Sequence, residues 1–145
     1  MPGALPTLSY DCIIKAAALG KLLGCKQQTE SFFDRKSYFY PDLPMGYQIT
    51  QFTRPLNING LVTYYNADYT QHNTAEILQA HVECDTAKTA HVGNQLLLDY
   101  NRAGTPLIEV VTAPSFHSAD EAIAFIKELQ RTLTYYNISE AQMDK

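Results

Sequence analysis

The sequence predicts an α+β fold, with an antiparallel or mixed sheet and flanking helices. A helical pattern at each end encloses a series of short strand patterns with hairpin signals between them, which is typical of α+β domains. The chain has 145 residues, of which 46% are hydrophobic. This is the size of one domain that buries a core of its own.

Two helices are expected. The first runs from about Ser9, a possible N-cap, to Leu23, and Gly24 ends it. The second follows a capping box, Ser118 to Glu121. The expected core face of the first helix is Ile14, Ala17, Ala18 and Leu22. That of the second is Ala122, Ile126, Leu129, Leu133 and Tyr136.

Several short strands lie between these helices. Asn59-Gly60 suits a type I′ hairpin turn, and the polar run 66–74 is expected to be an exposed insertion. The apolar density of the last strand predicts burial on both of its faces. The expected strands are Gln48–Phe52, Leu61–Tyr65, Ile77–Cys84, Gln95–Asp99 and Pro106–Val111.

The segment from Ser31 to Gln51 has the composition of a binding surface. Prolines and Gly46 break any regular pattern, and Asp34-Arg-Lys36 precedes several aromatic residues. Loops on a rigid scaffold often carry binding groups, whereas an ordinary connector is usually small and polar. The aromatic residues are Tyr38, Phe39, Tyr40 and Tyr47.

The strand that ends near Cys84 carries candidate metal ligands. Alternation along it places Gln79, His81, Glu83 and Asp85 on one face, and Leu78, Ala80, Val82 and Cys84 on the other. Carboxylates suit Mg²⁺, although imidazole is an unusual partner for so hard an ion. The alternative is an ordinary solvated face of an antiparallel strand.

Glu109 stands inside an apolar strand, which is costly if the carboxylate is buried without a partner. Arg102, in the Asn101-Arg102 turn, is the nearest cation in the sequence. Either the two form a structural ion pair, or Glu109 points into a polar site.

Composition excludes several classes of protein. The net charge of −4 argues against nucleic-acid binding by bulk electrostatics, and no apolar run is long enough to cross a bilayer. The 3 cysteines contain no CxxC pair, so a reducing compartment is expected and a structural zinc is not.

Several motifs, taken in order, resemble the catalytic domain of the aspartyl/glutamyl-tRNA amidotransferase B subunits, a family to which the archaeal E subunits are related. They are Met1–Pro6, Phe33–Lys36, Tyr38–Pro44, Gly46–Ile49, Asp99–Val110 and the Ser118 helix. The resemblance implies a partial glutamine synthetase-like domain over residues 1–145. The family's preceding Gly-Leu-Glu-Val-His segment and its helical tRNA-binding tail are missing, and the chain stops at Met143–Lys145 beside an acidic motif, so a fragment is expected.

The resemblance implies a function in translation. ATP phosphorylates glutamate misacylated on tRNA(Gln), and ammonia released from glutamine by the amidase A subunit then gives Gln-tRNA(Gln). Mg²⁺ and a C-type subunit, or its organellar equivalent, are expected too. Aspartyl-tRNA(Asn) stays open as a second substrate, and the fragment alone is expected to be inactive.

The resemblance also implies site residues. The family's metal motif falls on His81-Val-Glu-Cys-Asp85, which assigns Mg²⁺ to His81 and Glu83. The implied catalytic residues are Glu83, Asp85, Lys36 and Glu109. The implied substrate or nucleotide ligands are Asp34, Arg35, Tyr38, Tyr40, Asp42, Gln48, Asn101 and Arg102.

Two substitutions depart from the family pattern. Cys84 replaces the second Glu of the metal motif, and Met45 replaces a common Lys. Either the site tolerates them, or the chain is a non-catalytic remnant that keeps the fold and its contacts with other subunits. Ser31–Lys36 and Gly46–Gln51 look more like mitochondrial members, so a mitochondrial location is expected, with the bacterial cytoplasm as the alternative.

Overall fold

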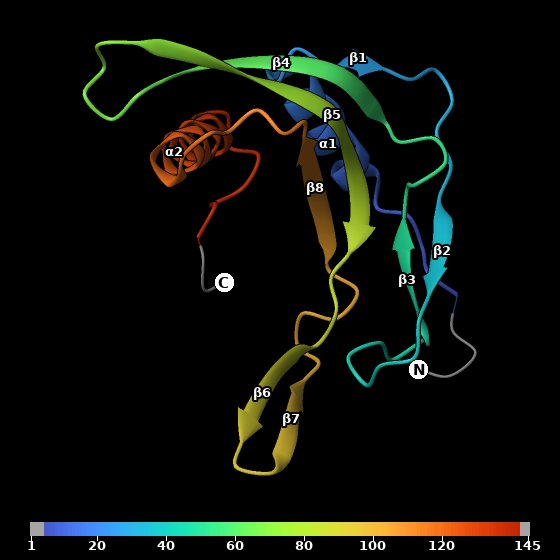
Figure 1. Cartoon of the computed structure of the whole chain (residues 1–145). Coiled ribbons are helices and arrows are strands. Elements are labelled where there is room, and N and C mark those ends of the chain that lie inside the picture. The colour runs from blue at the N-terminus through green and yellow to red at the C-terminus, as the bar shows by residue number, and fades with distance from the viewer. Residues whose placement is uncertain (1–4, 143–145) are drawn as a thin grey trace.

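The computed structural model describes residues 5–142 and centres on a four-stranded sheet with strand order β1-β4-β5-β8 (Figure 1). Met1–Ala4 of the first motif and Met143–Lys145 lie outside the described residues. The elements are α1 (Tyr10–Leu22), β1 (Lys26–Gln27), β2 (Asp34–Ser37), β3 (Tyr47–Thr50), β4 (Asn57–Tyr65), β5 (His72–Cys84), β6 (Lys88–Val92), β7 (Gln95–Asp99), β8 (Pro106–Thr112) and α2 (Ala119–Tyr135).

The predicted α+β fold is confirmed. Within residues 5–142 all strand pairs are antiparallel. Strands β2 and β3 form a separate two-stranded ribbon beside the lower half of β5, and β6 and β7 form a second ribbon that projects away from the main sheet (Figure 1). Strands β1, β2 and β6 were not expected. No helix in the described part of the chain is long and apolar enough to cross a membrane.

The predicted hairpin at Asn59-Gly60 is wrong, because β4 continues straight through it. Asn59 adopts a left-handed φ of 54°, while the pairing with β5 keeps one register on both sides. The register of β5 with β8 shifts between Ile77 and Gln79. We call this irregularity the kink of β5, and the side-chain alternation inverts there. Ala75 and Ile77 face the core above it, and Ala80 and Val82 face the core below it.

The core lies between the sheet and the two helices. Tyr64 of β4 is 1% exposed and meets the Phe125 ring of α2 edge-on at 5.8 Å, and Ile77 and Leu19 complete the cluster. The predicted face of α1 is only partly correct, since Leu22 packs against the core but Ile14 is 50% exposed. Instead, α1 buries Cys12, Ala16, Leu19 and Gly20.

Helix α1 approaches the sheet closely around Asn57, which is fully buried. The Asn57 amide donates to Ala16 O at 3.1 Å and to Ala80 O at 2.9 Å. A Cβ on Gly20 would lie 1.9 Å from Asn57 Oδ1, and one on Gly60 would lie 2.6 Å from Leu23 O. These glycines allow backbone and side chain to approach where a larger residue would collide.

The capping box of α2 is confirmed. Ser118 Oγ accepts from the Glu121 N–H at 3.2 Å, and Glu121 Oε2 accepts from the His117 N–H at 2.7 Å. By contrast, Ser9 precedes α1 without a side-chain cap bond. The predicted face of α2 is only partly correct. Leu129 and Leu133 pack on the core with Phe125, but Ile126 and Tyr136 are more than half exposed.

Two other expectations change. Strand β8 is an edge strand, and Leu107 on it is 37% exposed, so burial on both faces is wrong. The exposed insertion is shorter than expected, because residues 66–71 form the hairpin loop whereas 72–74 already belong to β5.

Candidate metal-binding cleft

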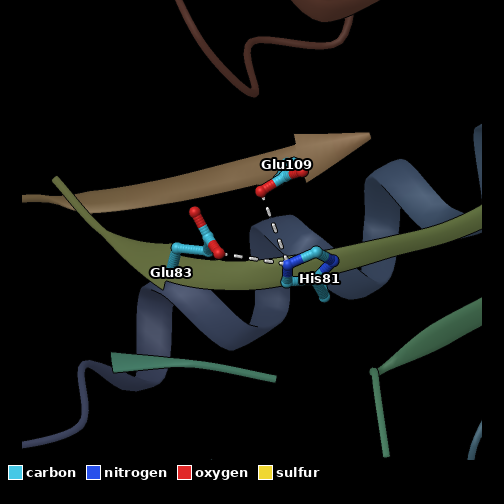
Figure 2. Close-up of side chains that lie close together, drawn as sticks. All are labelled: His81, Glu83 and Glu109. Atoms are coloured by element: carbon cyan, nitrogen blue, oxygen red, sulfur yellow. Dashed lines mark hydrogen bonds and ion pairs between the residues drawn. The ribbon is translucent and has the colours of Figure 1, made fainter. Parts of the chain in front are cut away.

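Three side chains meet on the face of the sheet away from α1 (Figure 2). His81 Nε2 lies 3.3 Å from Glu83 Oε1, on the same strand, and 3.7 Å from Glu109 Oε2 of β8. Glu109 reaches this position because it is the register partner of His81. We call these residues the His81 cluster.

The His81 cluster is largely buried. His81 is 4% exposed and Glu83 7%, so the alternative of an ordinary solvated face is wrong for these two residues. The Glu109 side chain is 50% exposed. Glu109 is therefore not the buried carboxylate expected from its apolar strand, and it lies beside His81 at the open side of the cluster.

The β2–β3 ribbon orients the buried carboxylate. Glu83 Oε1 accepts a hydrogen bond from Thr50 Oγ1 at 2.7 Å, and Oε2 accepts one from Gln48 Nε2 at 3.3 Å. The Gln48 amide also donates to Cys84 O at 2.9 Å. The Gln48 side chain is 7% exposed and supports Glu83. The resemblance had implied that Gln48 is a substrate ligand.

A cleft of about 600 Å³ opens between the ribbon and the His81 cluster. Its lining includes Arg35 and Lys36 of the ribbon, together with Asp34, and Glu83 and Glu109 of the sheet. The Arg35 guanidinium lies 4.8 Å from the centre of the Tyr47 ring, and Lys36 Nζ lies 5.9 Å from that of Tyr38. These cation–π contacts favour fixed positions for the positive charges.

The cluster fits a divalent cation. One nitrogen of His81 and one oxygen each of Glu83 and Glu109 lie within 4.8 Å of one another. Carboxylates suit Mg²⁺, which usually keeps several waters, and the exposed side of Glu109 leaves room for them. Imidazole also suits transition metals. His81 Nδ1 is buried without a hydrogen-bond partner in residues 5–142, so no acceptor in that part of the chain holds the ring through this nitrogen.

Asp34 lines the cleft, and its carboxylate holds the backbone of the segment after β3. Its Oδ2 accepts from the N–H groups of Phe52 and Thr53 at 3.0 and 2.8 Å, and its Oδ1 accepts from Thr53 Oγ1 at 3.2 Å. These bonds, led by that from the Thr53 N–H, lower the pKa of the Asp34 carboxyl.

The aromatic loop borders the ribbon. Burial, followed by the charge of Asp42, raises the pKa of Tyr38. The Asp42 backbone carbonyl accepts from the Ala87 N–H at 2.9 Å, which ties the loop to the segment after β5. Tyr40 is 45% exposed. Neither Tyr40 nor Asp42 lines the cleft.

Asp85, Asn101 and Arg102 do not line this cleft either. Arg102 Nη2 pairs with Asp85 Oδ2 at 3.0 Å, at the turn that leads into β8. The Asn101 N–H donates to Asp99 Oδ1 at 2.9 Å. Arg102 instead lines an apolar groove of about 790 Å³ between α1, β8 and α2. The structure therefore separates these residues from His81.

Cys84 is not part of the His81 cluster. Cys84 Sγ accepts a hydrogen bond from the Ile49 N–H at 3.2 Å, so the side chain points to β3. Cys84 is half-buried, in keeping with a packing residue more than a nucleophile.

Sequence reasoning missed two residues that support the site. Thr50 binds Glu83, and Gln51, which is 1% exposed, accepts from the Val82 N–H at 2.9 Å. Both lie within the segment from Ser31 to Gln51 that was predicted to be a binding surface, but only the fold brings them to β5.

The fold and cleft define an α+β domain with a candidate cation site in a cleft that Arg35 and Lys36 also line. Comparison with known proteins identifies the family. The model of the GatB/GatE catalytic domain matches residues 1–145. The chain belongs to this family.

The curated relatives are named as the B subunit of aspartyl/glutamyl-tRNA(Asn/Gln) amidotransferase. The chain is 43% identical over 145 residues to the protein of Sulfurovum sp. and 46% identical over 144 residues to that of Mycoplasmopsis agalactiae. These alignments cover 100% and 99% of the chain but 30% of each relative. The chain thus spans about a third of their length. Both relatives are bacterial.

Proposed function

We propose that this domain carries the carboxylate-activating site of a tRNA-dependent amidotransferase. The glutamate carboxylate on tRNA(Gln) attacks the γ-phosphorus of ATP, which releases ADP and gives an acyl phosphate. Ammonia then attacks the acyl carbon, phosphate leaves, and loss of a proton gives Gln-tRNA(Gln). The observation that carries this proposal is that the His81 cluster, Arg35 and Lys36 line one cleft.

The residues of the cleft mainly position charged reactants. Bound Mg²⁺, held by Glu83, Glu109 and His81, would neutralise the transferring phosphoryl group. Arg35 and Lys36 bind the phosphate oxygens. Thr50 keeps Glu83 in one orientation through its 2.7 Å hydrogen bond. In such a reaction, preorganised charge lowers the barrier without rearrangement during the transfer.

The proposal requires other subunits. An amidase A subunit supplies ammonia from glutamine, and a C-type subunit completes the assembly, consistent with the names of the relatives. Bacterial relatives favour the bacterial cytoplasm over the mitochondrial location expected from the sequence.

Glu109→Gln in the full-length protein tests the proposal. We expect about 100-fold slower formation of ADP that depends on Glu-tRNA(Gln), because one charged group is lost from the reacting site. Weaker Mn²⁺ binding in a direct titration should accompany it. Glu76→Gln is the matched control, since Glu76 lies on β5 but is exposed and does not line the cleft.

The competing hypothesis is the non-catalytic remnant. It predicts no ADP formation in the unsubstituted protein and no effect of Glu109→Gln. Unchanged Mn²⁺ affinity in that variant would remove Glu109 from the metal site.

A further inference from the structure

Phe52 is a large apolar side chain left in solvent at the charged cleft. It follows β3 closely, lines the cleft with Lys36 and His81, and is 80% exposed. No hydrogen-bonding group of its own accounts for the exposed position, and the ring does not support the core. Its position in the lining of the cleft makes it a candidate for ligand contact.

The backbone around Phe52 is fixed on both sides. Before it, Gln51 accepts from the Val82 N–H at 2.9 Å and donates through Nε2 to Ser31 Oγ at 2.6 Å. Ser31 Oγ in turn donates to Arg54 O at 2.7 Å. Asp34 Oδ2 accepts hydrogen bonds from both the Phe52 and the Thr53 N–H groups. The anchors around the loop therefore constrain the backbone that carries the exposed ring.

A fixed, exposed phenyl ring is suited to stacking. It offers a flat π face with no polar atom, and little entropy is lost when a ligand covers it, because its loop is already ordered. Purines provide the matching flat surface, and aromatic stacking on bases contributes substantially to nucleic-acid binding. The same cleft holds cations for phosphates and carboxylates for a metal.

We propose that Phe52 is the stacking surface for the adenine ring of a ligand whose phosphates lie between Lys36 and the His81 cluster. This inference rests on the proposed function and adds the base-recognition residue to it. Two ligands of that reaction carry adenine, namely ATP and the 3′-terminal adenosine of the tRNA. Asp34 is then a positioning residue, since it acts through the backbone that presents Phe52.

Phe52→Ala in the full-length protein tests the inference. Four probes are titrated in the presence of Mg²⁺: ATP, inorganic tripolyphosphate, tRNA, and tRNA without its terminal adenosine. We expect about tenfold weaker binding of one adenine-containing probe, with the matching adenine-free probe unchanged. Phe52→Trp should restore affinity. Tyr135→Ala is the control, because Tyr135 is also 80% exposed but lies on α2.

Each outcome decides the point. If Phe52→Ala loses affinity for ATP alone, the inference is supported and the nucleotide is the source of the adenine. If it loses affinity for intact tRNA alone, the inference is supported and the terminal adenosine is the source. No change for any probe, or equal loss for all, overturns it. If the unsubstituted protein binds neither ATP nor tripolyphosphate, the proposed function falls as well. If it binds both and Phe52→Ala changes nothing, only the role of Phe52 falls.

Discussion

The two halves of β5 differ in burial and in chemistry, because the upper half is buried on its core face alone and the lower half on both faces. Above the kink, Ala75 and Ile77 are fully buried against Tyr64 and its apolar neighbours. Below it, His81 and Glu83 are 4% and 7% exposed, and their neighbours are the polar side chains of the ribbon. The upper end of the strand thus contributes only to the core, whereas the lower end contributes to the core through Ala80 and Val82 and carries the site on its other face.

The difference shows how this strand buries charge. A carboxylate in a protein interior is costly unless hydrogen bonds replace its lost water, and Glu83 receives them from Thr50 and Gln48. The apolar half needs only packing. We therefore expect substitutions of the buried apolar residues to change stability, and those of the polar residues in the lower half to change ligand binding more than stability.

Ile77→Ala gives the largest expected effect. Ile77 is fully buried, so truncation leaves a cavity and should lower the free energy of unfolding by roughly 2–5 kcal/mol. Denaturant unfolding measures this. Leu78→Ala, at a neighbour that is 45% exposed, should cost much less. Mn²⁺ affinity at a temperature where the variant is folded should be unchanged, and a loss there would contradict the division of the strand.

Thr50→Val should give the next largest effect, a loss of metal affinity at the lower half of β5. It removes the 2.7 Å bond to Glu83 while keeping the shape of the side chain. Loss of such an outer support usually weakens metal binding by about 10–100-fold, which calorimetric titration with Mn²⁺ can measure. Thr63→Val on β4, outside the cleft, is the control. Affinity equal to that of the control would mean that Thr50 does not orient Glu83.

The smallest expected effect concerns the pH dependence of the Asp34 anchor. The folded-state pKa of Asp34 lies below its usual 3.8, so the anchor is complete above that pH and is lost as the pH falls through the lowered value. Amide hydrogen exchange should therefore show Phe52 and Thr53 losing protection only in that acidic range.

The Val82 N–H is the internal reference for this experiment, because its acceptor is the Gln51 amide, which does not titrate. Asp34→Asn should leave Phe52 and Thr53 weakly protected at every pH. Protection that follows the Val82 amide throughout would show that Asp34 does not hold this loop.

Local signals predicted the elements whose causes are local. The capping box at Ser118 and the alternating strand that ends at Cys84 both appear where the sequence indicates them. The hairpin prediction at Asn59-Gly60 was wrong because a left-handed residue also fits within a continuous strand here. Contacts distant in sequence decide between hairpin and continuous strand, since Gly60 fits beneath Leu23 O and Cys25 Sγ.

The candidate site was predicted in part for the same reason. His81 and Glu83 share a face of one strand, so their spacing was enough to suggest that they act together. The position of Glu109 beside them depends on the register of β8 against β5, and the support from Thr50 depends on the docking of the ribbon. The inverted alternation at the kink also explains why Leu78 left its predicted face.

The buried Asn57 has a mechanical consequence. Its amide joins Ala16 of α1 to Ala80, the residue directly before His81, and Gly20 leaves no space for the helix to slide past it. We therefore expect helix and strand to move together. The ribbon contacts β5 through side-chain hydrogen bonds such as those of Gln48 and Thr50, not through strand pairing. If the cleft widens or narrows, we expect the ribbon to be the part that is displaced.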